Sequence, residues 1–190
     1  MSWIIVGLGN PDAQYAGTRH NVGKDLVEAL KTKLPKSAKV AELNVYMNNS
    51  GGAIRKLIFG KVDTPIGSPT ASRRRKVAEK LVVVHDELDV PLGKVKISFG
   101  SSAGGHNGVK SVQAALKTQD FVRVRVGISP STSNGKLKRP EAKAITDFVL
   151  GKFKPAEQEK LKKVKKIVAE ALELIVTEGY EKAQTQINAR

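Results

Sequence analysis

Cysteine is absent from this chain of 190 residues, and aromatic and acidic residues are scarce. Without cysteine the protein has no disulfide, no thiol nucleophile and no thiolate metal site, which fits a reducing compartment. No apolar stretch approaches the roughly 20 residues that a helix needs to span a bilayer, so no membrane segment is predicted.

Basic residues outnumber acidic ones, 33 to 18, which gives a formal net charge of +15. A surface this positive attracts polyanions over a long range, and nucleic acid is the commonest such partner. An anionic membrane surface, or a charge that only keeps the protein soluble, are the alternatives. We therefore expect nucleic acid as the partner.

The length and the hydrophobic content, 40%, suit one domain with its own core over residues 1–190. The first apolar run begins at Trp3, which leaves no room for a conventional cleavable presequence. We expect a protein that works in the cytoplasm or in the mitochondrion.

A strand, a polar loop and a helix are predicted within the first thirty residues. Ile4–Val6 is an apolar run typical of a buried strand, and it ends at the glycines and the proline of Gly7–Pro11. Apolar residues then recur at helical spacing over residues 22–30. Ligand chemistry gathers at the carboxyl ends of strands in open α/β sheets, so Asn10 and His20 in the loop are candidate site residues.

A dinucleotide site is the first alternative at this stretch. Gly7 and Gly9 match the start of G-x-G-x-x-G, but Asp12 occupies the third glycine position. Pro11 also interrupts the turn that would open the helix. We therefore expect no nucleotide cofactor.

Further strands and helices indicate the fold class. Leu81–Val84 is a continuous apolar run, typical of a central strand. Val95–Phe99 and Val122–Ile128 alternate apolar with mostly basic residues, which predicts strands with basic outward faces. A long helix is predicted from Pro155 to Gly179. We predict an α/β fold with a mixed, twisted sheet and helices on both faces.

The pattern is weaker elsewhere. Residues 60–80 predict a surface insertion whose basic cluster, Arg73–Lys76, either touches RNA or is simply solvated. The remaining expectations are a weak strand at Val40–Tyr46, a turn at Asn48–Gly52, a short helix at Ala53–Phe59 and a flexible basic loop at Ser129–Pro140.

Each of the three histidines, His20, His85 and His106, is followed by asparagine or aspartate. A metal site is one interpretation, but no H-x-x-x-H spacing occurs, and the two acids beside His85 would point to opposite sides of a strand. We therefore predict no metal ligands.

General base catalysis is the better interpretation. A neutral histidine takes a proton from water near pH 7, and it works best when a carboxylate fixes its tautomer. Asp86 ends one predicted strand and His20 follows another, so the two meet if those strands are neighbours. No G-x-S-x-G motif and no cysteine are present, which favours direct attack by water over an acyl-enzyme. A structural ion pair is the alternative.

Backbone N–H groups at Gly104–Gly105 precede a predicted helix and are suited to an anionic oxygen, and Asn107 adds a side-chain amide. The alternative is an ordinary glycine turn with an asparagine cap.

Several segments together resemble the bacterial-type peptidyl-tRNA hydrolases. They occur in family order and are highly specific in combination. The segments are Val6–Pro11, Tyr15, Thr18–Gly23, Tyr46–Asn48, Ser50–Gly51, His85–Asp89, Gly104–Gly108, Arg123–Ile128 and Phe148–Gly151.

The resemblance implies a monomer that hydrolyses the ester between a peptide and the 3′ end of tRNA, without metal or organic cofactor. It implies His20 as the base, Asp86 as the group that holds it, and Asn10 as the sensor of a blocked amino group. It also implies contacts to the peptide, the CCA end and the acceptor stem. These would come from Tyr15, Tyr46, Met47, Asn48, His106, Asn107, Arg125 and Lys96.

The sequence departs from the family pattern at three places. Ser98 occupies the position of the lysine that joins Arg125 in contacting the tRNA 5′ phosphate, and Lys94 or Lys96 would replace it. The segment between Gly23 and Tyr46 is short, so edge strands are expected to be missing or altered. Residues 60–80 are longer. The length differences suggest a divergent eukaryotic or organellar member.

The competing hypothesis is a non-catalytic RNA-binding or splicing factor built on the same fold. Retention of the reacting groups discriminates the two. His20, Asp86, Asn10 and Asn107 are all present, which favours the enzyme.

Overall fold

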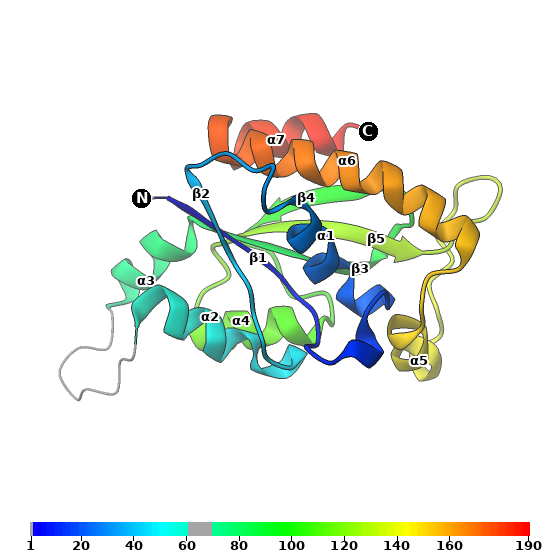
Figure 1. The fold of residues 1–190 in the computed structure, drawn as a ribbon, viewed down its shortest axis with the longest axis horizontal. Helices are drawn as coiled ribbons and strands as arrows, with labels where there is room; N and C mark the ends of the chain where they lie inside the picture. The colour runs from blue at the N-terminus through cyan, green and yellow to red at the C-terminus, as the bar shows by residue number, and fades with distance from the viewer. Residues whose placement is uncertain (1, 61–69) are drawn as a thin grey trace.

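Five strands form one mixed sheet in the computed structural model, which describes residues 2–60 and 70–190 (Figure 1). Their order across the sheet is β2-β1-β3-β5-β4, and β4 runs antiparallel to β5 whereas the other neighbours are parallel. The strands are β1 (Trp3–Gly7), β2 (Ala38–Ala41), β3 (Leu81–Pro91), β4 (Val95–Phe99) and β5 (Val122–Ser129). The predicted mixed sheet is confirmed.

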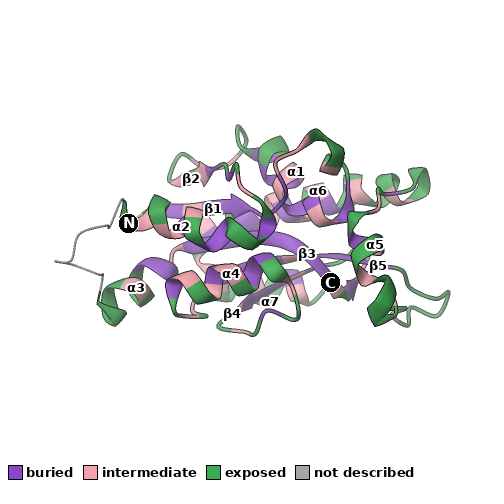
Figure 2. Cartoon of the chain, turned by 90° about the horizontal axis from the view of Figure 1, so that it is seen from below, coloured by how far each residue is buried: buried purple, intermediate pink, exposed green. Residues whose placement is uncertain are grey.

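Helices cover both faces of the sheet, as predicted (Figure 1). One face packs against α1 (Val22–Leu30), α6 (Pro155–Glu178) and α7 (Tyr180–Asn188), and the other against α2 (Ser50–Phe59) and α4 (Asn107–Leu116). Two further helices, α3 (Ala71–Ala78) and α5 (Ile145–Leu150), lie at opposite ends of the molecule. Figure 2 shows the buried strands between helices whose outer sides are exposed.

Short 3₁₀ helices lie in the connections. They are η1 (Ala13–Tyr15), η2 (Arg19–Asn21), η3 (Met47–Asn49) and η4 (Ala142–Ala144). None of the helices in the described part of the chain is long and apolar enough to cross a bilayer.

The segment before β3 differs from its prediction. The edge strand is β2 at Ala38–Ala41, not Val40–Tyr46, so a short edge strand is present although the segment is short. Helix α2 begins at Ser50, where a turn was predicted. An added Cβ at Gly51 would lie 1.9 Å from the Ser111 carbonyl oxygen of α4. This glycine therefore permits close packing of two helices rather than a turn.

The predicted insertion at residues 60–80 lies partly outside the described residues, which omit 61–69. Its second half forms α3, which begins where the Thr70 hydroxyl accepts the Arg73 backbone N–H. Within the basic cluster, the Arg75 guanidinium lies 2.8 Å from the Asp120 carboxylate. At least one member of the cluster therefore already pairs with an acid of the same chain.

The prediction that β4 and β5 present basic side chains to solvent is wrong in part. Arg123 is only 3% exposed, because the loop that precedes α4 covers it. Its guanidinium donates to the Ser101 hydroxyl of that loop. Lys96 reaches around the edge strand and donates to the Asn188 carbonyl of α7 at 2.7 Å. Arg125 remains partly exposed and pairs with Glu87 at 2.8 Å.

Direct backbone contact positions α1 on the sheet. An added Cβ at Gly7 would lie 2.3 Å from the Gly23 carbonyl oxygen, and one at Gly23 would lie 2.2 Å from the Val84 carbonyl oxygen. Only glycine allows this approach. It brings the segment before α1, including His20, next to β3.

We expect Gly23→Ala to lower the free energy of unfolding by about 1–3 kcal/mol, because the added methyl group overlaps the backbone of β3. Gly52→Ala is the matched control, since a Cβ at that helical position meets nothing within 4 Å. Alanine there should raise stability by about 0.4–1 kcal/mol. Urea denaturation measures both, and equal stability of the two variants would contradict the packing argument.

Candidate active site

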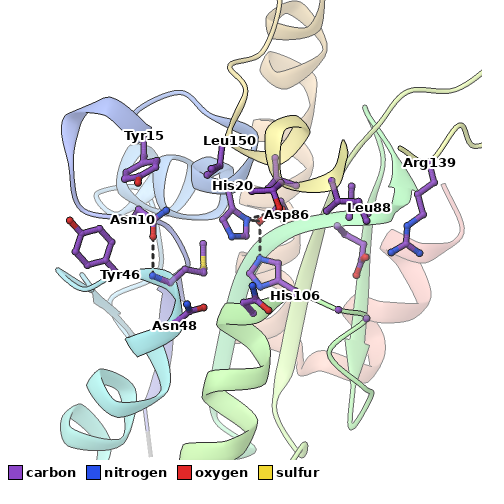
Figure 3. A pocket seen from close by; sticks show the side chains of 18 residues that line it. Asn10, Tyr15, His20, Tyr46, Asn48, Asp86, Leu88, His106, Arg139 and Leu150 are labelled. Carbon is purple, nitrogen blue, oxygen red and sulfur yellow. Dashed lines mark hydrogen bonds and ion pairs between the residues drawn. The ribbon is translucent and has the colours of Figure 1, made fainter. Parts of the chain in front are cut away.

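A cavity of about 360 Å³ lies beyond the carboxyl end of β1 and beside the second half of β3. Apart from Arg125 and Lys96, every residue predicted to form the site lines it (Figure 3). These are Asn10, Tyr15, His20, Tyr46, Met47, Asn48, Asp86, His106 and Asn107. Residues far apart in the sequence are thus brought to one place.

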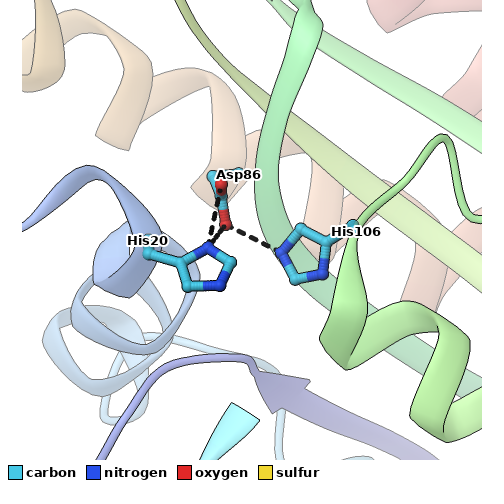
Figure 4. Close-up of side chains that lie close together, drawn as sticks. All are labelled: His20, Asp86 and His106. Atoms are coloured by element: carbon cyan, nitrogen blue, oxygen red, sulfur yellow. Dashed lines mark hydrogen bonds and ion pairs between the residues drawn. The ribbon is translucent and has the colours of Figure 1, made fainter. Parts of the chain in front are cut away.

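The Asp86 carboxylate lies between two imidazole rings (Figure 4). His20 Nδ1 is 3.0 Å from Oδ1 and 3.1 Å from Oδ2 of Asp86, and His106 Nε2 is 2.8 Å from Oδ1. Asp86 is 3% exposed, so water reaches it little. The predicted meeting of His20 with Asp86 is confirmed, since β1 and β3 are parallel neighbours. The contact between His106 and Asp86 was not predicted.

The hydrogen bonds define the tautomers of both rings. His106 Nδ1 accepts the Val109 backbone N–H at 3.2 Å, so Nε2 carries the proton that it donates to Asp86. His20 likewise donates from Nδ1 to the carboxylate, which leaves its Nε2 as a base. The arrangement therefore presents one unprotonated imidazole nitrogen that a carboxylate has oriented.

Ligand atoms of His20, Asp86 and His106 all lie within 4.8 Å of one another, which raises the question of a metal. A metal on His106 Nε2 would require the proton of that ring to sit on Nδ1. The Val109 N–H points at Nδ1, and two donors cannot share a hydrogen bond. The geometry therefore favours a hydrogen-bonded cluster at this position.

Two pKa values in the cluster depart from their ordinary values. Burial alone would raise the pKa of Asp86, but the electrostatic attraction and hydrogen bond of the His106 N–H, together with the hydrogen bond of His20, hold it well below the usual range. Burial, reinforced by the nearby His106 and Arg123, lowers the pKa of His85 well below its usual value. Asp86 is therefore ionised and His85 neutral around pH 7.

Asn10 is held in place by its oxygen and its backbone. Its Oδ1 accepts the Met47 N–H at 2.9 Å, its N–H donates to Asn21 Oδ1 at 2.8 Å, and Asn21 Nδ2 returns a bond to the Asn10 carbonyl at 3.0 Å. The amide nitrogen is thus the end that can donate to a ligand. Asn21 was not predicted as a functional residue, although it lies inside the segment Thr18–Gly23.

Arg19 anchors the turn that carries His20. Its guanidinium donates to the carbonyls of Phe148, Gly151 and Lys152 and pairs with Glu157 at 2.7 Å. It also stacks over the Phe148 ring. These contacts tie η2 to α5 and α6, so the position of His20 depends on residues more than a hundred positions away.

The opposite walls of the cavity differ in character (Figure 3). One carries Tyr15 and Tyr46, whose hydroxyl donates to Asp12 at 2.5 Å. Leu88 and Arg139 lie on the other side, and Leu150 of α5 lies between the two. None of these side chains was predicted. The missed residues are Leu88, Arg139, Ile145, Thr146, Val149 and Leu150. Three of them, Leu88, Val149 and Leu150, lie within the matching segments His85–Asp89 and Phe148–Gly151.

Arg125 and Lys96 lie outside the cavity lining. Arg125 is nevertheless connected to it, because its partner Glu87 lines the cavity next to Asp86. Lys96 is bound to the end of α7, which gives no support to a role beside Arg125. Ser98, at the position of the family lysine, is buried.

Comparison with known proteins points to one family. Residues 4–190 match the family model described as Peptidyl-tRNA hydrolase. The chain is 34% identical to the peptidyl-tRNA hydrolase of Kineococcus radiotolerans, covering 99% of this chain and 98% of that one. The Mycobacterium tuberculosis protein of the same name is 35% identical, with 98% and 97% covered. The crystal structure of peptidyl-tRNA hydrolase from Acinetobacter baumannii is similar with a TM-score of 0.77 and 27% identity, covering 99% and 95%.

Burial of neutral His85 predicts a pH-dependent stability. The lowered pKa means that the unfolded chain binds a proton which the folded chain does not. Stability is therefore fully present above the unfolded pKa of about 6.5 and is lost as the pH falls below it, by up to about 1.4 kcal/mol per pH unit.

We expect the stability advantage of the wild type over His85→Gln to shrink between pH 7 and pH 5. Urea denaturation at each pH measures it. Both proteins keep every other ionisable side chain, so the difference between them reports on His85. An advantage that stays constant with pH would show that His85 does not protonate on unfolding.

Proposed function

The chain belongs to the peptidyl-tRNA hydrolase family, and on this premise we propose that His20 and Asp86 carry out hydrolysis of the ester between a peptide and the 3′ end of tRNA. The observation that carries the assignment is the oriented Nε2 of His20, which faces a cavity lined by side-chain amides. Such hydrolysis frees tRNA from aborted translation.

The reaction begins at a water molecule held by His20 Nε2. The ring takes one proton while the water oxygen attacks the ester carbonyl carbon, and Asp86 stabilises the imidazolium that forms. Collapse of the tetrahedral intermediate breaks the bond to the ribose 3′ oxygen, which receives the proton back from His20. The products are free tRNA and a peptide carboxylic acid, which loses its proton to solvent and leaves as the carboxylate. The chain has no cysteine and no G-x-S-x-G motif, which supports direct attack by water.

Amide donors at the cavity stabilise the negative oxygen of the intermediate. The candidates are the side chains of Asn10 and Asn107 and the backbone N–H groups of Gly104 and Gly105, all of which line the cavity. Donors of this kind are most effective when they are fixed before the reaction. Asn10 meets that condition through its bonds to Met47 and Asn21.

The remaining predicted residues form the substrate contacts. Asn10 distinguishes a blocked from a free amino group, because its fixed amide can donate to a peptide carbonyl. Tyr15, Tyr46 and Asn48 border the peptide and the terminal nucleotide, Met47 adds an apolar surface, and His106 places the acceptor end while it also orients Asp86.

Phosphate contacts supply affinity for tRNA without reading its sequence. The net charge of +15 supports them, and Arg125 is a partly exposed arginine whose partner Glu87 lines the cavity. We assign it a phosphate of the acceptor stem. A monomeric state and action in the cytoplasm or in the mitochondrion belong to the same proposal. The RNA-binding factor without catalysis gains no support from the relatives, which are named as hydrolases.

We expect His20→Ala to lower turnover of an N-acetylated aminoacyl-tRNA by at least about 10²–10⁴-fold while tRNA binding stays near the wild-type level, since a general base contributes about this much. Release of free tRNA measures turnover, with chelator present and with unblocked aminoacyl-tRNA as the control substrate. Substantial activity in the variant would exclude His20 as the base. A folded wild type that binds tRNA without cleaving it would support the RNA-binding factor.

We expect Arg125→Ala to weaken tRNA binding and to reduce the slope of log affinity against log salt by about one unit, the signature of one lost phosphate contact. The variant also leaves Glu87 unpaired beside the cavity, so Glu87→Gln combined with Arg125→Ala is the control. The double variant should keep the reduced slope. A wild-type slope in both would contradict the contact.

A further inference from the structure

Among the described residues that line the cavity, Arg139 is the only one with a permanent positive charge. Two carboxylates, Asp86 and Glu87, also line it. Asp86 accepts hydrogen bonds from His20 and His106, and Glu87 pairs with Arg125 and accepts the Asp89 N–H. Both carboxylates thus have partners other than Arg139, so neither needs Arg139 to neutralise its charge.

The contact that holds Arg139 is an exchangeable one. Its Nη1 lies 2.7 Å from Asp89 Oδ1, and the two side chains are 43% and 42% exposed. Exposed ion pairs of this kind contribute only about 0–1 kcal/mol, because water and salt compete with them. A guanidinium has five N–H donors in a planar fork, so it can turn toward a stronger anion at little cost.

The segment that carries Arg139 is ordered by its own hydrogen bonds. Thr132 and Lys136 bond to one another, a bridge joins Ser131 to Leu137, and the Lys138 N–H donates to the Pro130 carbonyl at 2.9 Å. Lys138 and Pro140 are the two residues that flank Arg139 in the sequence. The predicted flexible basic loop is therefore a small hairpin that returns to the cavity and presents Arg139 at its rim.

Figure 3 shows Arg139 on the Leu88 side of the cavity, away from Tyr15 and Tyr46. Asp89, its partner, follows Leu88 on β3, the same strand that carries Asp86. The site therefore has a reacting centre at His20, a tyrosine side and a cationic side. An ester at the ribose 3′ oxygen has its nearest phosphodiester one sugar away, on the 5′ side of the terminal nucleotide.

We propose that Arg139 leaves Asp89 and binds the phosphodiester on the 5′ side of the terminal adenosine of the substrate, which places the ester against His20. The inference rests on the proposed function, because it concerns the same substrate. Arg139 is a specificity residue in this account: it distinguishes an ester borne by an oligonucleotide from one borne by a nucleoside. Asp89 holds the guanidinium when no phosphate is present.

The test compares three esters of one N-acetylated amino acid: with tRNA, with the trinucleotide CpCpA, and with adenosine, which has no phosphodiester. We expect Arg139→Ala to raise KM about tenfold for the first two with little change in kcat, and to leave hydrolysis of the adenosine ester unchanged, because one charge-assisted contact is lost. Arg139→Lys should restore part of the affinity. Lys136→Ala, in the same hairpin but outside the cavity lining, should behave as the wild type.

The variant Asp89→Asn tests whether Arg139 binds phosphate or only holds the hairpin through its ion pair with Asp89. If Asp89 competes with the phosphate, this variant should lower KM for the CpCpA ester several-fold. If the Asp89–Arg139 pair only holds the hairpin, both variants would raise KM for all three esters alike, which would overturn the proposal. No change in KM for Arg139→Ala on the CpCpA ester would overturn it as well.

Calorimetry of the unacylated trinucleotide CpCpA tests phosphate binding by Arg139 independently of turnover. We expect Arg139→Ala to weaken it about tenfold relative to the wild type, and equal binding would overturn the inference. A wild type that binds CpCpA through Arg139 but does not cleave any of the esters would contradict the proposed function and leave the inference standing.

Discussion

The structure of the site depends on one buried carboxylate shared by two histidines. Asp86 is the middle residue of β3 rather than the end of a strand as predicted, and it accepts from His20 on one side and from His106 on the other. Burial would protonate an isolated carboxyl, whereas the two N–H donors keep its pKa low and the group ionised. Each ring is oriented in turn, so that His20 presents Nε2 to the cavity. Removing any member leaves a buried polar group without its partner.

The surrounding fold maintains this arrangement from several directions. Backbone contact at Gly23 sets α1 and the turn before it against β3. Arg19 ties the same turn to α5 and α6, and the Val109 N–H at the start of α4 fixes the ring of His106. Elements from both layers of helices therefore converge on Asp86. A group that must be held within tenths of an ångström is thus supported by contacts from several regular elements.

The sequence alone predicted those features that depend on local residue patterns and on the order of the strands. The β1–α1 unit follows from an apolar run and helical spacing, and the approach of His20 to Asp86 follows once β1 and β3 are neighbours. The burial of Arg123 was not predictable. Alternation of residue types along a strand shows which side chains share a face of the sheet, but it does not show whether another segment covers that face. Gly51 was misassigned to a turn because the helix that approaches it lies sixty residues further on. Arg139 was missed because only the hairpin's return path brings it to the cavity.

In the proposed mechanism Asp86 acts on the reaction only through His20. Turnover numbers of the wild type, His20→Ala, Asp86→Asn and the double variant, measured on one N-acetylated aminoacyl-tRNA, form a cycle that tests it. The account predicts that Asp86→Asn loses most of the turnover and that the double variant is no slower than His20→Ala alone. Losses that multiply in the double variant would show that Asp86 contributes independently and would contradict the account.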